Sequence, residues 1–208
     1  MTDVLERLLA RHRPISEQVS QNELRCILRE LDAALQRSGG RGIVVEFGCY
    51  IGTTSLFIRR YLDSCGVKGR FYVFDSFEGL PSKSSPDHSP SGEQFVPGAL
   101  RVSRKDFEKQ FKKAGLNLPY IHKGWFDQIE QAAIPSDIVF AFLDGDYFAS
   151  IRDSLRLITP QLRLGATIVV DDYANEALPG VAKAVEEWAG GRQVRIRVEQ
   201  SLAIITVL

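Results

Sequence analysis

The chain has 208 residues, enough for one α/β domain with a large core and too few for two comfortable ones. Lysine plus arginine and aspartate plus glutamate both number 26. The chain therefore lacks the excess positive charge that would indicate a nucleic-acid partner. Residues 1–13 lack the features of a secretory signal, and no apolar stretch reaches membrane-spanning length. We therefore expect a cytoplasmic protein that binds neither nucleic acid nor membrane.

The three cysteines, Cys26, Cys49 and Cys65, are odd in number and lack the spacing of metal ligands. In a cytoplasmic chain this usage predicts reduced, buried thiols. Cys49 lies within a glycine-rich turn, but no histidine is near it in the sequence, which argues against a nucleophilic role.

Two amphipathic helices are predicted before the first strand. The first lies within residues 3–14, and the second begins at a capping box formed by Ser20 and Glu23. We interpret residues 1–40 as a helical extension to a domain of residues 41–208. The extension can cover the sheet, the ligand, or a partner subunit in a homodimer or higher homo-oligomer.

A glycine-rich turn follows the first predicted strand, Ile43 to Glu46, which is apolar, β-branched and ends on a carboxylate. Gly48 and Gly52 allow positive φ and close backbone approach, and residues 53–55 offer hydroxyls to cap the next helix. The spacing differs from the fingerprint that binds a pyrophosphate, which favours a ligand without a diphosphate. The alternative is a tight turn that binds nothing.

The second predicted strand, Arg70 to Phe74, is followed by Asp75, which lies 23 residues beyond Gly52. A doubly wound fold places a ribose-binding carboxylate at about this spacing, so Asp75 is interpreted as a ribose acceptor. The alternative is a plain turn residue or cap. The loop at about residues 81–100 is rich in proline and is predicted to be a lid, mobile without ligands and ordered over them.

The rest of the chain continues an alternation of strands and helices. Strands are predicted at residues 120–122, 137–143, 164–170, 194–198 and 202–207, and helices at 104–114, 148–158 and 180–188. The last two strands are expected to form an antiparallel hairpin.

Trp125 follows the third strand and either stacks on a purine or belongs to the core. His122 is interpreted as a structural hydrogen-bonding residue rather than a base.

Two neighbouring strands each end on paired carboxylates, namely Asp144 with Asp146 and Asp171 with Asp172. These four acids are expected at one edge of the sheet, where their mutual repulsion favours a bound cation. Ligation by oxygen alone suits Mg²⁺, Mn²⁺ or Ca²⁺ rather than zinc. The alternative is that Asp146 or Asp172 caps a helix.

Five ordered motifs resemble S-adenosylmethionine-dependent O-methyltransferases of the macrocin O-methyltransferase type, which modify sugar hydroxyls of natural products. The motifs are Glu-Phe-Gly-Cys-Tyr-Ile-Gly (46–52), Phe-Asp-Ser-Phe-Glu-Gly-Leu-Pro (74–81), Lys-Gly-Trp-Phe (123–126), Leu-Asp-Gly-Asp-Tyr-Phe-Ala-Ser (143–150) and Val-Asp-Asp-Tyr (170–173). The resemblance implies an α/β fold with a Rossmann-like, doubly wound, mostly parallel sheet of seven strands and a reversed last strand, preceded by two N-terminal helices.

The resemblance also implies the roles of individual residues. Asp144, Asp171 and Asp172 are expected to hold Mg²⁺ or Mn²⁺, and Asp146 is expected to be the general base. The residues expected to bind S-adenosylmethionine are Glu46, Gly48, Tyr50, Gly52, Thr53, Asp75, Ser76, Gly124, Trp125, Phe126 and Asp144. The acceptor is expected to be a polyhydroxylated small molecule whose hydroxyl loses its proton and attacks the sulfonium methyl group.

Two other classes of protein compete with this interpretation. The acidic motifs also resemble those of haloacid-dehalogenase phosphatases, but that class needs a lysine between them, and residues 147–170 contain none. A protein that binds S-adenosylmethionine without turnover would have the same site, so only an activity assay distinguishes it from the enzyme.

Overall fold

The computed structural model describes residues 2–67, 70–91 and 95–208, so part of the predicted lid, residues 92–94, lies outside the described residues. The described chain forms a sheet of seven strands with helices on both faces. The strands are β1 (Ile43–Phe47), β2 (Phe71–Asp75), β3 (Tyr120–Lys123), β4 (Ile138–Leu143), β5 (Leu162–Val170), β6 (Val194–Glu199) and β7 (Leu202–Val207). The α-helices are α1 (Thr2–Arg11), α2 (Gln21–Arg37), α3 (Thr53–Ser64), α4 (Arg104–Ala114), α5 (Phe148–Ile158) and α6 (Pro179–Ala189).

The strand order is β3-β2-β1-β4-β5-β7-β6, and every pair from β3 to β5 is parallel. β7 runs antiparallel to both β5 and β6. This arrangement confirms the predicted Rossmann-like sheet with a reversed last strand and the predicted terminal hairpin. The order reverses on either side of β1, so β1 and β4 flank the position where doubly wound folds bind ligands.

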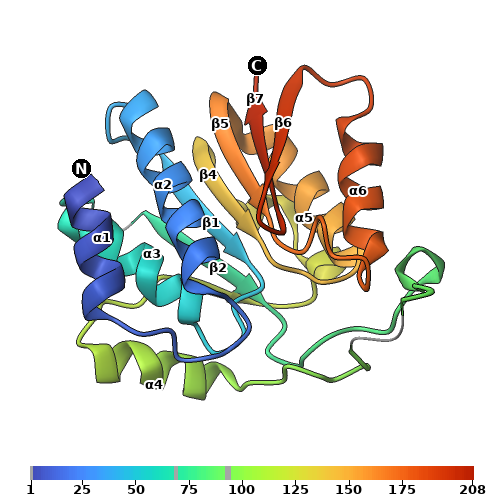
Figure 1. The fold of residues 1–208 in the computed structure, drawn as a ribbon, viewed down its shortest axis with the longest axis horizontal. Helices are drawn as coiled ribbons and strands as arrows, with labels where there is room; N and C mark the ends of the chain where they lie inside the picture. The colour runs from blue at the N-terminus through green and yellow to red at the C-terminus, as the bar shows by residue number, and fades with distance from the viewer. Residues whose placement is uncertain (1, 68–69, 92–94) are drawn as a thin grey trace.

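Each face of the sheet has its own apolar core. Buried residues of α1, α2, α3 and α4 pack on one face, and those of α5 and α6 pack on the other. Figure 1 shows α1, α2 and α3 to the left of the sheet and α5 and α6 to its right. β4 is buried along its whole length, as expected for a central parallel strand covered on both faces.

The N-terminal helices belong to the first of these cores. α2 begins at the predicted capping box, in which the Ser20 side chain accepts from the Glu23 amide and Glu23 accepts from the Ser20 amide. Its apolar side, including Leu24 and Leu31, is fully buried with residues of α1 and of the sheet. Of the three surfaces that the helices were expected to cover, the structure shows them on the sheet.

Two local expectations were wrong. Residues 53–55 do not cap α3, because Gly52 is the N-cap residue, at φ 95°, and no side chain caps the helix. The Thr53 hydroxyl instead contacts the Ser16 hydroxyl at 2.7 Å. Of the cysteines, Cys65 is exposed rather than buried, because it follows the last turn of α3 at the surface.

The predicted lid is also more structured than its composition suggested. It contains a 3₁₀ turn, Ser85–Asp87, and its two ends pair through hydrogen bonds from the Leu80 amide to the Ala99 carbonyl and from the Gly98 amide to the Leu80 carbonyl. Backbone hydrogen bonds therefore join the two ends of this segment.

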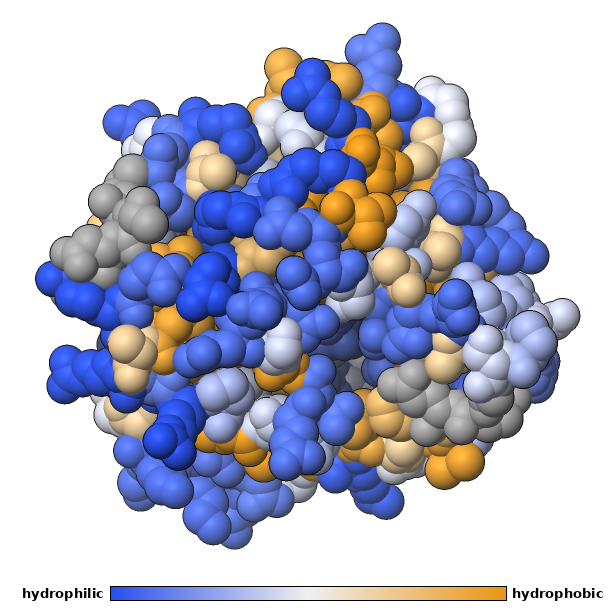
Figure 2. All heavy atoms as spheres, viewed as in Figure 1, coloured by the Kyte–Doolittle hydropathy of each residue, from blue (hydrophilic) through white to orange (hydrophobic). Residues whose placement is uncertain are grey.

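The surface in Figure 2 is largely hydrophilic, with apolar atoms gathered over the ends of β5 and the β6–β7 hairpin. Leu164 of β5 is 76% exposed, the highest value for a large apolar side chain among the described residues. None of the described helices combines the length and apolar composition that a membrane span requires.

Candidate active site

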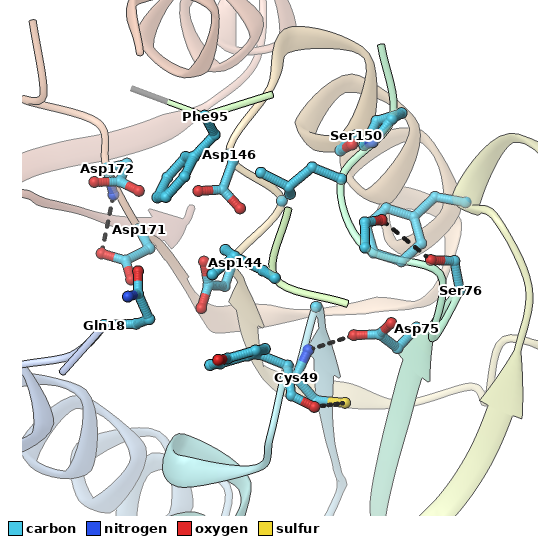
Figure 3. Close-up of a pocket in the computed structure, with 18 of the residues that line it drawn as sticks. Gln18, Cys49, Asp75, Ser76, Phe95, Asp144, Asp146, Ser150, Asp171 and Asp172 are labelled. Carbon is cyan, nitrogen blue, oxygen red and sulfur yellow. Dashed lines mark hydrogen bonds between the residues drawn. The ribbon is translucent and has the colours of Figure 1, made fainter. Parts of the chain in front are cut away.

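A cavity opens at the carboxyl ends of β1, β2, β4 and β5, where the segments before α2 and after β2 also converge. Its described lining is Gln18, Gly48, Cys49, Tyr50, Asp75, Ser76, Gly79, Leu80, Pro81, Phe95, Leu100, Trp125, Phe126, Asp144, Gly145, Asp146, Ser150, Asp171 and Asp172. Figure 3 shows the aspartates of the loops after β4 and β5 on one side of this cavity and Asp75 on the other.

The glycine turn after β1 lies in close contact with the backbone that follows β4. Gly48 has φ 83°, and a Cβ atom there would lie 1.8 Å from the carbonyl oxygen of Asp144. The Gly48 amide also donates to the Phe74 carbonyl at 2.9 Å. Only glycine satisfies both the conformation and the space. The chain therefore brings its backbone, rather than a side chain, to the floor of the cavity.

Asp75 holds this turn in place. One carboxylate oxygen accepts from the Cys49 amide at 2.8 Å, and the other accepts from the Phe77 amide at 2.6 Å. Each oxygen keeps a further lone pair, so Asp75 can still accept from a ligand hydroxyl. The structure thus adds a role in shaping the turn to the predicted role in ribose binding.

Glu46 lies behind the turn and is 1% exposed. Its Oε2 atom accepts from the Ser55 hydroxyl at 2.5 Å, while Oε1 has no hydrogen-bond partner among the described residues. Burial raises the pKa of Glu46 to about 8, opposed by the Ser55 hydrogen bond and reinforced by the charge of Asp75. Burial also raises the pKa of the Cys49 thiol well above its ordinary range, which disfavours the thiolate form.

The acidic residues after β4 and β5 form a compact cluster. Carboxylate oxygens of Asp144, Asp146 and Asp172 all lie within 4.8 Å of one another. Asp146 and Asp172 have φ 55° and 56°, so both turns adopt the left-handed conformation that aspartate tolerates better than most residues. Neither residue caps a helix: the N-cap residue of α5 is Tyr147, and that of α6 is Leu178. This removes the capping alternative.

Burial and mutual repulsion raise the pKa values of the cluster. Burial is the larger cause for Asp144, whose pKa lies well above its ordinary range, followed by the charges of Asp171 and Asp146. Burial and the charge of Asp172 raise the pKa of Asp146 to about 7. The pKa of Asp172 is also raised by burial, although a hydrogen bond from Asn175 opposes the rise. Such a set of oxygens suits a hard divalent cation, which would relieve the repulsion.

Asp171 lies beside this cluster but is not one of its three members. Its Oδ1 atom accepts from the Asp172 amide at 2.9 Å, and the Ser201 hydroxyl lies 3.5 Å away. The same hydroxyl donates to Glu23 at 2.7 Å. Geometry therefore groups Asp146 with two of the predicted metal ligands, whereas Asp171 also faces the β6–β7 turn and α2.

An aromatic wall closes the side of the cavity opposite the acids. Trp125 and Phe126 line it, and Phe126 meets Phe47 edge to face with ring centroids 5.3 Å apart. Of the two interpretations of Trp125, stacking on a ligand agrees better with its position in the cavity lining than a place in the core does. His122 stacks on Phe74 at 4.8 Å, so its ring packs among aromatics.

Most of the predicted site residues meet in the cavity. Four predicted residues do not line it, namely Glu46, Gly52, Thr53 and Gly124. Nine lining residues were not predicted from the sequence, namely Gln18, Cys49, Gly79, Leu80, Pro81, Phe95, Leu100, Gly145 and Ser150. Several of these lie inside the motifs at residues 46–52, 74–81 and 143–150 or inside the predicted lid. Their position there was the available signal that they belong to the site. Gln18 lies in the N-terminal segment and had no such signal.

A family model described as macrocin-O-methyltransferase (TylF) matches residues 19–203. A tetracenomycin-type enzyme of Streptomyces olivaceus, 8-demethyl-8-(2,3-dimethoxy-alpha-L-rhamnosyl)-tetracenomycin-C 4'-O-methyltransferase, is 32% identical over 158 residues, 73% of this chain and 59% of that protein. Mycinamicin III 3''-O-methyltransferase of Micromonospora griseorubida is 29% identical over 160 residues, 73% of this chain and 62% of that protein.

Among solved structures, the O-methyltransferase NovP superposes with a TM-score of 0.78 at 22% identity, covering 100% of this chain and 88% of NovP. TomG of Streptomyces achromogenes, solved in complex with SAM, superposes with a TM-score of 0.60 at 16% identity, covering 99% of this chain and 89% of TomG. At these identities the superpositions establish the fold. The chain spans about three fifths of the length of the two curated relatives described above. By the match to the family model over most of its length, the chain belongs to the macrocin O-methyltransferase (TylF) family.

Proposed function

We propose that the protein transfers the methyl group of S-adenosylmethionine to a hydroxyl of a sugar or glycosylated natural product, with the help of a divalent cation. The observation that carries the proposal is one cavity with a glycine turn and Asp75 on one side and three clustered carboxylates on the other. Family membership, relatives named as methyltransferases of glycosylated compounds, and a structural neighbour solved with SAM support it.

The chain binds the cofactor through its backbone and Asp75. The glycine turn allows an adenosine to approach the carboxyl end of β1, and Asp75 accepts from a ribose hydroxyl with its remaining lone pairs. Trp125 and Phe126 offer apolar surface to the base. S-adenosylmethionine supplies the electrophilic methyl group, and its positive sulfonium suits a cavity rich in carboxylates.

The carboxylates of Asp144, Asp146 and Asp172 are close enough to share one cation, and Asp171 lies next to them. A bound Mg²⁺ or Mn²⁺ would supply Lewis-acid polarisation and a fixed position for the acceptor hydroxyl. The residues fit such an ion, because a buried all-oxygen set with raised pKa values gains from a nearby positive charge.

Asp146 is proposed to accept the proton of the acceptor hydroxyl. It lines the cavity, is 7% exposed and lies in the turn between β4 and α5. A cation bound at the cluster would lower the raised pKa of Asp146, so its carboxylate would be ionised and able to take the proton. Gln18, Leu80 and Phe95 also line the cavity and are proposed to contact the acceptor.

The test is incubation of the purified chain with methyl-labelled S-adenosylmethionine, Mg²⁺ and a panel of sugars and glycosylated compounds that carry vicinal hydroxyls. We expect label to appear on an acceptor oxygen, and transfer to stop when a chelator removes the cation and to resume when Mg²⁺ is restored. Cofactor binding without transfer to any acceptor would support the non-catalytic alternative. Transfer that persists in chelator would refute the cation's role.

A further inference from the structure

The further inference concerns Asp87, a residue of the 3₁₀ turn in the segment after β2, which no part of the proposed mechanism uses. Its side chain is 1% exposed although it carries a polar carboxyl group. The Oδ2 atom accepts from the Ser84 amide at 2.8 Å and from the Ser84 hydroxyl at 2.6 Å. The Oδ1 atom accepts from the Phe148 amide at 2.6 Å. This carboxylate therefore joins two parts of the chain that are 61 residues apart.

The contact with Phe148 replaces a local helix cap. α5 begins at Phe148, and its N-cap residue, Tyr147, contributes no capping hydrogen bond from its side chain. The first amides of a helix lack internal partners and carry a partial positive charge, so a carboxylate there is stabilising. Asp87 supplies that carboxylate from a distant segment.

The first turn of α6 packs directly against the same hydrogen bond. A Cβ atom on Gly180 would lie 1.9 Å from Oδ1 of Asp87 and 2.9 Å from the Phe148 amide nitrogen. Because φ at Gly180 is not positive, the glycine is required by lack of space rather than by backbone conformation. The first turns of α5 and α6 and the 3₁₀ turn thus meet at Asp87.

This junction lies next to the proposed base. Asp146 precedes Phe148 by two residues, in a turn held by a hydrogen bond from the Tyr147 amide to the Gly145 carbonyl at 2.6 Å. On the other side, Leu80 and Pro81 run from the cavity lining into the segment that carries Asp87. A shift at Asp87 therefore reaches both Asp146 and the wall that faces the acceptor.

We propose that Asp87 is a positioning residue, which clamps residues 81–91 to the first turn of α5 and so fixes the Asp146 carboxylate relative to the bound acceptor. The proposal rests on the proposed function for its catalytic consequence, but the clamp itself is independent of turnover. A displacement of about 1 Å in a reacting group can lower a rate by about 10²-fold, so loss of the clamp should be visible in kcat.

The experiment compares three changes at the junction. Asp87→Ala removes the carboxylate, Gly180→Ala pushes it away without altering it, and Asp87→Asn keeps one oxygen for the Phe148 amide. The first control, Gly190→Ala, adds the same methyl group at the other end of α6, where its closest contact would be 3.4 Å. The second control, Asp106→Ala, removes a carboxylate from the first turn of α4, away from α5.

Two measurements are made on each variant. Hydrogen exchange at amides 146–151, without ligands, should be about fivefold faster in Asp87→Ala and Gly180→Ala, as expected for a lost helix cap. For methyl transfer, kcat should fall by about 10 to 10²-fold in both, while the Kd for S-adenosylmethionine stays within about twofold. Asp87→Asn should regain part of kcat, because asparagine keeps an oxygen for the Phe148 amide although its NH2 group cannot accept from the Ser84 amide. Both controls should behave as the wild type.

Unchanged exchange in Asp87→Ala and Gly180→Ala would overturn the clamp. Faster exchange with an unchanged kcat, or an Asp87→Asn variant as slow as Asp87→Ala despite normal exchange, would overturn the positioning role. If Asp87→Ala does not fold, Gly180→Ala and Asp87→Asn still decide the question. If the wild type transfers no methyl group, the proposed function fails while the exchange data still test the clamp.

Discussion

Glu46 offers a test of the electrostatics behind the glycine turn that does not depend on any ligand. Its carboxyl group is fully enclosed, with one oxygen bonded to the Ser55 hydroxyl and the other lacking a partner among the described residues. Burial, together with the charge of Asp75, raises its pKa from the ordinary 4.5 to about 8. We expect Glu46→Gln to fold and to keep the Ser55 contact, because glutamine retains the shape and one acceptor oxygen.

The sign of the pH effect follows from the direction of the shift. At neutral pH the folded chain holds a proton on Glu46 that the unfolded chain has released, so the stabilising contribution is complete below about pH 4.5 and is lost as pH rises to about 8. A rise from 4.5 to about 8 corresponds to roughly 5 kcal/mol, at about 1.4 kcal/mol per pKa unit. This is an upper limit, and we expect about 2 to 5 kcal/mol.

The assay is urea denaturation of both proteins between pH 5 and pH 9 in the presence of a chelator. Relative to Glu46→Gln, the wild type should lose stability steadily up to about pH 8 and then change no further. The matched control is Glu186→Gln, at an exposed position of α6, which should follow the wild type at every pH. Parallel curves for the wild type and Glu46→Gln over this range would refute the reasoning.

Two further predictions concern the cofactor side of the cavity. Asp75→Ala should weaken S-adenosylmethionine binding by about 1 to 3 kcal/mol, because it leaves the ribose hydroxyls without their acceptor, and unchanged affinity in calorimetry would rule out that role. Gly48→Ala should abolish cofactor binding and destabilise the fold by more than about 2 kcal/mol in urea, because its methyl group meets the Asp144 carbonyl at 1.8 Å in addition to the strain of positive φ. Gly66→Ala, also at positive φ but in open space, should show only the strain; equal losses in the two variants would contradict the steric argument.

The features that the sequence predicted well are those set by local pattern. β1 and β4 are short apolar runs with an acidic residue at the carboxyl end, Glu46 one residue before the end of β1 and Asp144 directly after β4. The register of parallel strands brings these ends to one edge. The capping box at Ser20 and Glu23 is equally local, since its two bonds join residues three apart. For this reason the strands and the position of the acidic cluster could be stated from local pattern, whereas the reversed last strand of the sheet followed from the family resemblance.

The features that were missed depend on contacts between distant residues. The cap of α5 comes from Asp87, and no spacing rule links it to Phe148. The prolines and glycines of the predicted lid suggested that this segment packs poorly. That composition does not reveal the buried carboxylate of Asp87, which bonds the segment to α5. The grouping of Asp146 rather than Asp171 with Asp144 and Asp172 depends on two turns with positive φ, which aspartate adopts without a distinctive sequence signal.

Those two turns make it possible to separate a base from a metal ligand by matched substitutions. Asp146 and Asp172 have nearly the same left-handed φ, which asparagine tolerates as well as aspartate, so Asp146→Asn and Asp172→Asn should both fold without new strain. Neither residue caps a helix, so loss of a cap does not enter the comparison. Each change removes one negative charge from the same cluster.

The two variants should nevertheless fail differently. Asparagine cannot take the acceptor proton, so Asp146→Asn should lower methyl transfer by about 10² to 10⁴-fold at saturating Mg²⁺, with cofactor and cation affinity nearly intact. Asp172→Asn should weaken cation binding, and added Mg²⁺ should partly restore its turnover. Near-normal turnover by a folded Asp146→Asn variant would remove Asp146 from the role of base. A loss that Mg²⁺ restores in both variants would instead make Asp146 a third ligand, as its distance from Asp144 and Asp172 allows.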